Sequence, residues 1–509
     1  MTENRKYSNS QITGFVSGIV LFALILFFGA GSVNPTAYNM AATAVLMAVW
    51  WISEAIPLGA TSLIPVVVFP LLGISSGTDA ASEYFNSTIF LFLGGFLIAI
   101  AMERWNLHKR IALIIILFLG SGSSGIILGF MLATAFLSMF ISNTATALMM
   151  LPIGISVIHK MQESYKGKDA DNFPVSLMLG IAYGASLGGI ATLVGTPPNL
   201  AFVRIFHISF PESPEISFGN WMLLGLPIAI VMLFLTWILL TKILYKLKNK
   251  TSFDKQLLRE EYKLLGKPGF EEKCVLAVFV LTAVLWVFRA DLSFGSFVLP
   301  GWSNLIGNSK YIDDSTVAIL MSLLLFILPA KTGERKRLLN AKSFGKIPWE
   351  IVILFGGGFA LASGFQSSGL SELLGNQLTA LSGIPPILMI VIVCFCLTFL
   401  TELTSNTATT QTLLPIIAAI SVAMRINPLF LMIPATLSAS FAFMMPVATP
   451  PNAIVFSSGK VTIKQMATTG LILNLVGIVV VTLMFYFLGD FLFGINPNEF
   501  PLWAVPKEQ

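Results

Sequence analysis

The pentapeptide SNTAT occupies Ser142–Thr146 and returns unchanged at Ser405–Thr409, 263 residues later. Each copy lies in the middle of an apolar stretch, Gly125–Ile158 and Ile384–Ala423, that is too long for one membrane span and too interrupted for two. We predict that both stretches are re-entrant helical hairpins, because unpaired polar groups at membrane depth are tolerated only beside a cavity. For a single copy, helix capping by Ser, Thr and Asn at a buried turn is the simpler reading.

Two further motifs indicate that the surrounding sequence is repeated as well. The tripeptide GGF at Gly94–Phe96 returns at Gly357–Phe359 with the same spacing of 263 residues, and TPPN at Thr196–Asn199 returns at Thr449–Asn452, 253 residues later. Each repeat carries five predicted spans and one hairpin, and an odd number of spans inverts the second copy. One hairpin should therefore enter the membrane from the inside and the other from the outside. In carriers, the substrate site lies where such repeats meet.

The predicted fold class is an all-α polytopic membrane protein, with eleven transmembrane helices and two hairpins in an inverted repeat. The predicted spans are Thr13–Gly31, Ala41–Trp51, Pro57–Leu72, Ser87–Met102, Val175–Val203, Trp221–Leu240, Cys274–Val287, Thr316–Pro329, Trp349–Gly364, Leu429–Phe456 and Met466–Phe493. The segments divide as follows: a first transmembrane helix at 13–40, repeat 1 at 41–245 with an inner hairpin at 125–158 and a broken helix at 175–208, a cytoplasmic connector at 246–273, and repeat 2 at 274–493 with an outer hairpin at 384–423 and a broken helix at 429–456.

Composition and charge agree with a membrane location. Hydrophobic residues make up 55% of the 509 residues and charged residues only 11%, whereas about a quarter of the residues in soluble proteins are charged. With the N-terminus cytoplasmic and the C-terminus extracytoplasmic, the inner segments hold 25 of the 30 Lys and Arg residues. The net charge of +5 is therefore a topology signal of a multi-pass inner-membrane protein in contact with lipid, and nucleic-acid binding is not expected.

The adjacent prolines predict a second kind of break. Two consecutive prolines remove two N–H donors from a helix, so Val175–Val203 and Leu429–Phe456 should each consist of two half-helices joined by an unwound link. Carbonyl groups exposed in such a link can coordinate a cation, and half-helix N-termini favour an anion. One small cavity can then hold both ions.

Other classes of function fit the sequence less well. The three cysteines lack metal-site spacing, the three histidines stand apart at the ends of apolar runs, and the SNT motifs contain no titratable neighbour for a serine nucleophile, so an enzyme is not expected. An anion channel would also show re-entrant segments, but it has less need for two hairpins that close one site. Glycines 180, 184 and 188 form a small-residue ridge that predicts close helix packing.

The paired SNT tips, the paired TPPN breaks and the eleven-span pattern resemble the divalent anion/sodium symporter family, over roughly Gly14–Phe493. That family includes carriers of succinate, malate, fumarate, citrate and sulfate. The resemblance implies a homodimer that carries small dicarboxylates by an elevator mechanism, in which a mobile transport domain moves its site against a scaffold. It implies no cofactor, with Na⁺ as the candidate coupling ion.

The resemblance also assigns residues to the site. It implies substrate contact from both tips and both breaks: Ser142, Asn143, Thr144, Ser405, Asn406, Thr407, Thr196, Pro197, Thr449 and Pro450. It implies two candidate sodium sites, one per repeat: Ser138, Asn143 and Gly195, and Thr401, Asn406 and Ala448.

The coupling mode rests on one charged residue. Arg204 follows Asn199 by five residues on the outer half-helix, and a fixed positive charge there would lessen the need for a mobile cation. The alternative is an ordinary interfacial arginine. We expect dicarboxylate exchange, with sodium-coupled symport of a dicarboxylate, citrate or sulfate as the alternative. The acidic residues Glu54, Glu103, Glu350 and Glu402 lie near span ends, where interfacial or capping roles are expected and proton coupling is the alternative.

Overall fold

The computed structural model describes residues 8–119, 122–164, 168–247, 255–295, 297–332, 336–377, 383–496 and 499–505. The two ends of the chain, whose sides of the membrane are predicted above, lie outside the described residues, as do residues 248–254 of the predicted connector. Within the described residues the chain is helical apart from loops and one two-stranded antiparallel sheet.

The first half of the chain forms these elements: α1 (Asn9–Gly29), α2 (Pro35–Ser53), α3 (Leu58–Thr61), α4 (Ile64–Leu71), α5 (Gly77–Ser82), α6 (Ser87–Arg104), α7 (Leu107–Phe118), α8 (Ser123–Ser138), α9 (Asn143–Ser164), α10 (Lys168–Gly189), α11 (Pro197–Ser209), α12 (Phe218–Ile238) and the π-helix η1 (Leu239–Leu244).

The second half forms these elements: α13 (Gln256–Leu264), α14 (Phe270–Val287), β1 (Leu292–Phe294), β2 (Phe297–Leu299), the 3₁₀-helices η2 (Trp302–Leu305) and η3 (Ser309–Tyr311), α15 (Asp314–Ile327), the 3₁₀-helix η4 (Ala341–Lys346), α16 (Trp349–Ser367), α17 (Leu370–Gln377), α18 (Pro386–Thr401), α19 (Asn406–Ala423), α20 (Pro428–Ser438), α21 (Pro450–Ser457), α22 (Ile463–Phe493) and the 3₁₀-helix η6 (Leu502–Ala504).

Six helices of the described chain are long and apolar enough to cross a membrane: Asn9–Gly29, Gly77–Arg104, Asn143–Met161, Phe218–Leu244, Trp349–Ser367 and Ile463–Phe493. Shorter apolar helices supply further membrane-depth structure. Because Asn143–Met161 belongs to a predicted hairpin, length alone does not distinguish a crossing helix from a hairpin limb. The count of eleven crossings stays a prediction.

Local sequence explains where several helices differ from the predicted spans. The predicted span Ala41–Trp51 belongs to the longer α2, which starts at Pro35 because Pro is accepted at the first helical position and the Asn34 side chain accepts a hydrogen bond from the Ala37 N–H (3.1 Å). The predicted span Pro57–Leu72 forms the two short helices α3 and α4. Helix α7, an apolar helix that follows a sharp corner after α6, was not predicted.

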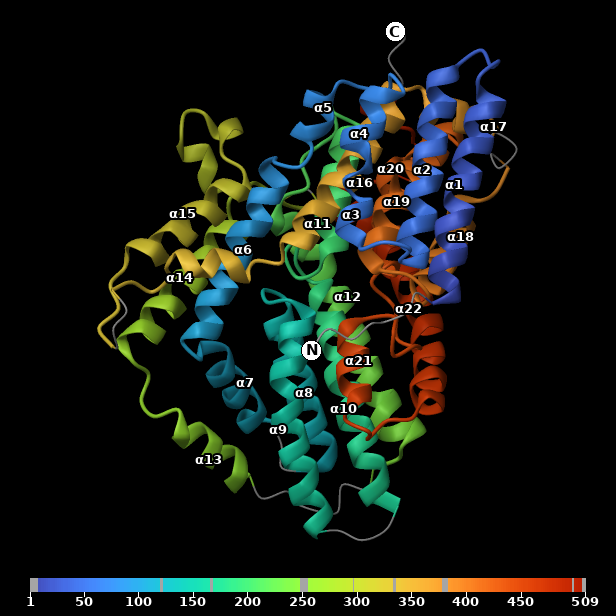
Figure 1. The fold of residues 1–509 in the computed structure, drawn as a ribbon. Coiled ribbons are helices and arrows are strands. Elements are labelled where there is room, and N and C mark those ends of the chain that lie inside the picture. The colour runs from blue at the N-terminus through green and yellow to red at the C-terminus, as the bar shows by residue number, and fades with distance from the viewer. Residues whose placement is uncertain are drawn as a thin grey trace.

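Both SNT segments lie at the turn of a helical hairpin. Helices α8 and α9 pack together around a turn at residues 139–142, and α18 and α19 pack together around a turn at residues 402–405. In Figure 1 the α8–α9 hairpin extends upward from the lower end of the molecule, whereas α18 and α19 lie in the upper part. The two turns thus approach the same level from opposite sides, as the inverted repeat predicts.

Both predicted broken helices are broken, although the prolines do not occupy the unwound links. Helices α11 and α21 begin at Pro197 and Pro450, and the links are the residues before them, 190–196 and 439–449. The reason is that a proline at the first helical position costs nothing, because its missing N–H would have no partner there. The prolines therefore start the second half-helices.

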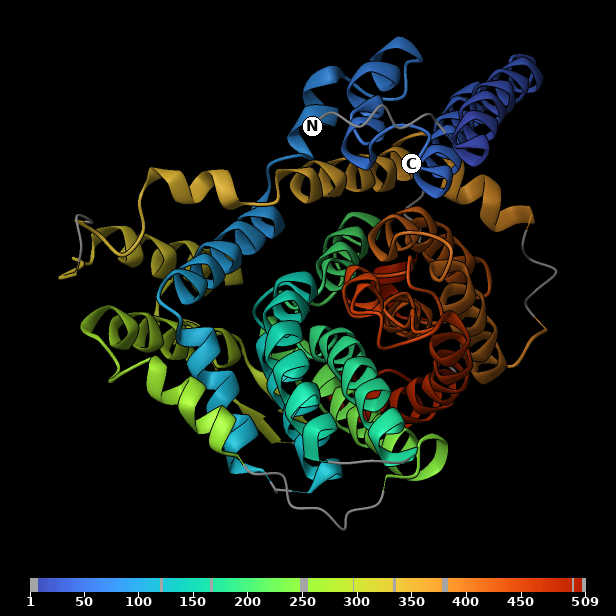
Figure 2. The ribbon, with the colours of Figure 1, turned by 60° about the horizontal axis from the view of Figure 1, so that its bottom comes forward.

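Packing separates two groups of helices. Figure 2 shows α8–α12 and α18–α22 gathered in one bundle, with α16 and α2–α4 along one side and α6 along another. A second, smaller hydrophobic cluster joins α2, α4, α5, α16 and α17, and it reaches the bundle at Ala408 of α19. Inside the bundle the glycine ridge of α10 is confirmed as a packing surface, because a Cβ at Gly188 would lie 2.1 Å from the carbonyl oxygen of Ala135 on α8.

Candidate functional site

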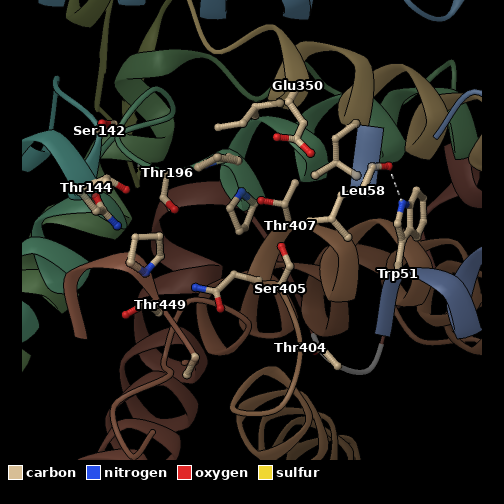
Figure 3. A pocket seen from close by; sticks show the side chains of 18 of the residues that line it. Trp51, Leu58, Ser142, Thr144, Thr196, Glu350, Thr404, Ser405, Thr407 and Thr449 are labelled. Carbon is tan, nitrogen blue, oxygen red and sulfur yellow. Dashed lines mark hydrogen bonds between the residues drawn. The ribbon is translucent and has the colours of Figure 1, made fainter. Parts of the chain in front are cut away.

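A cavity of about 800 Å³ lies where the two hairpin turns and the two unwound links meet. Figure 3 shows the labelled polar side chains of the tips and links on one side and Glu350, Leu58 and Trp51 on the other. All ten residues that were predicted to contact substrate line it: Ser142, Asn143, Thr144, Thr196, Pro197, Ser405, Asn406, Thr407, Thr449 and Pro450. The fold therefore brings the predicted set together, and its role in substrate binding stays a prediction.

In repeat 1, the three predicted cation-site groups are in contact. In the amide orientation that satisfies both of its polar atoms, the Asn143 side-chain nitrogen donates to Ser138 Oγ (2.5 Å) and to the carbonyl oxygens of Ala185 and Gly195 (both 3.3 Å). Ser138 is fully buried. A hydroxyl, a carboxamide and two carbonyls, all neutral oxygen-bearing groups, converge at one point of the cavity wall.

Repeat 2 preserves the hydroxyl and amide pair. Thr401 Oγ1 lies 2.7 Å from Asn406 Oδ1 and 2.9 Å from the carbonyl oxygen of Ala439, and either oxygen can accept its hydrogen bond. Ala448, the predicted third group, lines the same cavity, but the link carbonyl at the Thr401 hydroxyl belongs to Ala439. Ala439 was missed because the sequence suggested that the link lay at the prolines.

Two asparagines hold the links in shape, and neither was assigned a role from sequence. Asn199 Nδ2 donates to the carbonyls of Gly189 (3.2 Å) and Thr192 (2.7 Å), while Asn452 Nδ2 donates to those of Ala442 and Met445 (both 3.0 Å). Both side chains are fully buried. The last letter of each TPPN motif thus ties the first turn of the second half-helix back to its link.

A buried carboxylate supports only the second link. Glu402 is 3% exposed, and it accepts hydrogen bonds from the backbone N–H groups of Phe443 (2.7 Å), Met444 (2.8 Å) and Met445 (3.1 Å) and from Asn474 Nδ2 (2.7 Å). The buried carboxylate bonds to the amides of the unwound link, so the capping role expected for the residue is directed at the link. The sequence signal was its position directly after Thr401 at the hairpin turn.

Helices α9, α11, α19 and α21 begin at the cavity, at Asn143, Pro197, Asn406 and Pro450. The N-terminus of a helix presents free N–H groups and a partial positive charge, so these ends suit an anion without any basic side chain. Ser142 Oγ accepts a hydrogen bond from the Ala145 N–H (3.2 Å) and caps α9, whereas Ser405 makes no capping hydrogen bond to α19. The two tips therefore differ in helix capping, and the Ser405 hydroxyl is not used as a cap.

The charges that face the cavity are negative. Among the described residues that line it, the ionisable ones are Glu54 and Glu350, and no Lys, Arg or His is present. Arg204 does not line the cavity, and its guanidinium pairs with Glu83, the residue that follows α5 (2.9 Å). The expected use of Arg204 as a fixed charge that offsets the substrate was therefore wrong, because that charge is already neutralised elsewhere.

Comparison with known proteins identifies the family. A family model described as the sodium:sulfate symporter transmembrane region matches residues 9–495. The chain belongs to this family, the divalent anion/sodium symporters. It is 44% identical to the sodium-dependent dicarboxylate transporter SdcS of Staphylococcus saprophyticus over 98% of this chain and 95% of the relative, and 43% identical to SdcS of Staphylococcus aureus over the same shares.

Solved structures share the fold at low sequence identity. MtrF of Neisseria gonorrhoeae, described as one of a class of antimetabolite efflux pumps, matches with a TM-score of 0.56 and 12% identity over 95% of this chain and 96% of that one. The YdaH transporter of Alcanivorax borkumensis matches with a TM-score of 0.55 and 12% identity over 88% and 98%. The resemblance found in the motifs is thus confirmed, the relatives are transporters, and the chain is a multi-pass carrier of a dicarboxylate transporter family.

Proposed function

We propose that this chain is a sodium-coupled symporter of small C4-type dicarboxylates such as succinate, malate and fumarate. The substrate binds between the two SNT tips and the two half-helix N-termini. Sodium ions bind at the Ser138, Asn143 and Gly195 group and at the Thr401 and Asn406 group, with the link carbonyl of Ala439 or Ala448.

The observation that carries this proposal is the charge of the cavity. A dianion that enters a space lined by helix N-termini, neutral polar groups and two carboxylates meets no fixed cation among the described lining residues. Helix dipoles contribute only fractions of a charge, and they do not neutralise two full charges. Mobile cations that bind beside the substrate would offset its charge, and the relatives named above are described as sodium-dependent.

This proposal replaces the expectation of dicarboxylate exchange. That expectation depended on Arg204 as a fixed counter-charge, and Arg204 pairs with Glu83 outside the cavity. Exchange and symport use the same tips and links, so a transport experiment is needed to distinguish these two modes of coupling.

For the transport movement we propose an elevator mechanism. Helices α8–α11 and α18–α21 of the bundle are the mobile part, and the remaining helices form the scaffold through which two protomers join as a homodimer. The cavity supports this division. One wall comes from the tips and links of the bundle, and the other comes from Trp51, Leu58, Phe96 and Glu350 of the surrounding helices. Eleven crossings with a cytoplasmic N-terminus remain the proposed topology.

The test is uptake of radiolabelled succinate into proteoliposomes that contain no internal dicarboxylate. An inward sodium gradient should drive accumulation, and replacement of sodium by choline or potassium should abolish it. Unlabelled fumarate and malate should compete, and sulfate should serve as the comparison anion. Uptake that requires internal dicarboxylate and continues in choline would establish exchange and overturn the proposal.

A further inference from the structure

Glu350 is a charged residue of the cavity wall that the proposed binding site does not use. It stands in the first turn of α16, and in Figure 3 its carboxylate points into the cavity from the side away from Ser405 and Thr449. Gly59 of α3 gives its side chain room, because a Cβ at that position would lie 3.2 Å from Glu350 Cγ. The carboxylate thus faces the space that the tips and links enclose.

Among the residues that the structure describes, no charge partner for this carboxylate is found. The ion pairs of the described chain join other residues, and no Lys or Arg among the described lining residues faces the cavity. Glu54, the other acidic lining residue, ends α2 in a left-handed backbone conformation (φ 49°), and its carbonyl accepts a hydrogen bond from Gln11 Nε2 (3.2 Å). The acidic residue whose carboxylate can be followed into the cavity in Figure 3 is Glu350.

We propose that Glu350 limits the charge of the substrate, by admitting a dicarboxylate dianion and excluding a tricarboxylate trianion. This inference rests on the proposed function. Each of the two carboxylates of a bound C4 acid occupies the pair of helix N-termini, one at the tip and one at the link, that one repeat supplies. A third carboxylate, as in citrate, has no tip or link N-terminus left and projects toward the opposite wall, where it meets the negative charge of Glu350.

The size of the effect follows from Coulomb's law. Two like charges about 8 Å apart, in a cavity with an effective dielectric constant of about 30, repel enough to change binding roughly tenfold. Water within the cavity lessens this repulsion and a drier cavity increases it. The two charges of a dicarboxylate lie farther from Glu350, with more water and salt between them and the carboxylate, so their repulsion is more strongly screened and the affinity of the dicarboxylate changes less.

The experiment compares Glu350→Gln with the wild type, using citrate above neutral pH as the competitor of labelled succinate uptake in sodium. The wild type should bind citrate weakly. The variant should need about tenfold less citrate for half-inhibition, while its half-saturating succinate concentration changes less than about threefold. Glu350→Asp retains the charge and should exclude citrate as the wild type does.

The control addresses the position of Glu350 at a helix N-terminus. Glu372 also stands in the first turn of a helix, α17, but it is exposed and does not line the cavity, so Glu372→Gln should leave the preference unchanged. Unchanged citrate exclusion in Glu350→Gln, an equal shift in Glu372→Gln, or a wild type that carries citrate as well as succinate would each overturn the inference. A wild type that carries no dicarboxylate at all would refute the proposed function as well.

Discussion

The two repeats keep the same hydroxyl and amide beside the cavity but support the neighbouring link in different ways. In repeat 1 the hydroxyl belongs to Ser138. The next residue is Met139, whose carbonyl oxygen accepts a hydrogen bond from Thr192 Oγ1 (2.5 Å). Trp221 Nε1 donates to the carbonyl oxygen of Ile190 in the same link (3.0 Å). All of these groups are neutral, and the link is the short segment between Gly189 and Pro197.

By the spacings of the repeated motifs, Glu402 of repeat 2 corresponds to Met139 of repeat 1, and Asn474 corresponds to Trp221. Their side chains bond to each other, and the carboxylate also holds three consecutive amides of a longer link between Ser438 and Pro450. A buried carboxylate therefore stands behind the second candidate cation site, whereas the corresponding residue among those described in repeat 1 is the neutral Met139. The difference teaches that two sequence repeats can keep the same hydroxyl and amide while their supports become electrostatically unequal.

The substitution with the largest expected effect on this difference between the repeats removes the charge of Glu402. In Glu402→Gln, the amide N–H₂ faces backbone N–H groups that the carboxylate had satisfied, at a cost of about 3 kcal/mol or more. We expect sodium-driven succinate uptake to fall by roughly 100-fold, with a lower melting temperature and a higher half-saturating sodium concentration in the remaining activity.

The matched control is Met139→Leu, at the corresponding position of repeat 1. This change conserves volume and keeps the backbone carbonyl, so it should cost less than about 1.5 kcal/mol and leave sodium dependence unchanged. Equal losses in the two variants, or normal transport by Glu402→Gln, would show that the two links are not electrostatically different.

The second test asks whether the two tips share one substrate. Asn143→Ala and Asn406→Ala each remove an amide that borders the cavity and contacts the buried hydroxyl of its own repeat. Each loss should cost on the order of 1.5–3 kcal/mol, or about 10- to 100-fold in succinate affinity, if the amide meets a carboxylate. Competition binding to purified, folded protein measures this. Near-normal affinity in either variant would contradict a shared site.

The sequence predicted the site better than it predicted the supports of the site. Repeated motifs at one spacing located both tips, because polar residues in an apolar hairpin have few physical explanations. The sequence did not show that the difference between Met139 and its counterpart Glu402 matters, because a single glutamate near a span end is usually interfacial. Its role depends on the amides of residues 443–445, which are far away in sequence and lie together with it only in the fold.

The residues at which the unwound links begin and end also could not be predicted from the sequence. A pair of prolines predicts that a helix breaks, but it does not say on which side the unwound residues lie. The position of the break depends on Asn199 and Asn452, whose amides bond to carbonyls several residues upstream. Likewise, the charge of Arg204 could be read from the sequence, whereas its neutralisation by Glu83 depends on the packing of α11 against the scaffold.

The smallest expected effect concerns that ion pair, which has no equivalent in repeat 2, where Ser457 stands at the corresponding position by motif spacing. Glu83 and Arg204 lie on opposite sides of the proposed boundary between scaffold and mobile bundle, and both are partly shielded from solvent.

Arg204→Gln leaves the carboxylate of Glu83 without its partner, so uptake should fall about threefold, which corresponds to under about 1 kcal/mol. The double variant Arg204→Gln with Glu83→Gln should recover most of that loss, since neither side then carries an unpaired charge. Sodium dependence should be the same in all three proteins. If Arg204 instead offset the charge of the substrate, its loss would weaken dicarboxylate binding at least tenfold, and removal of Glu83 would not restore it.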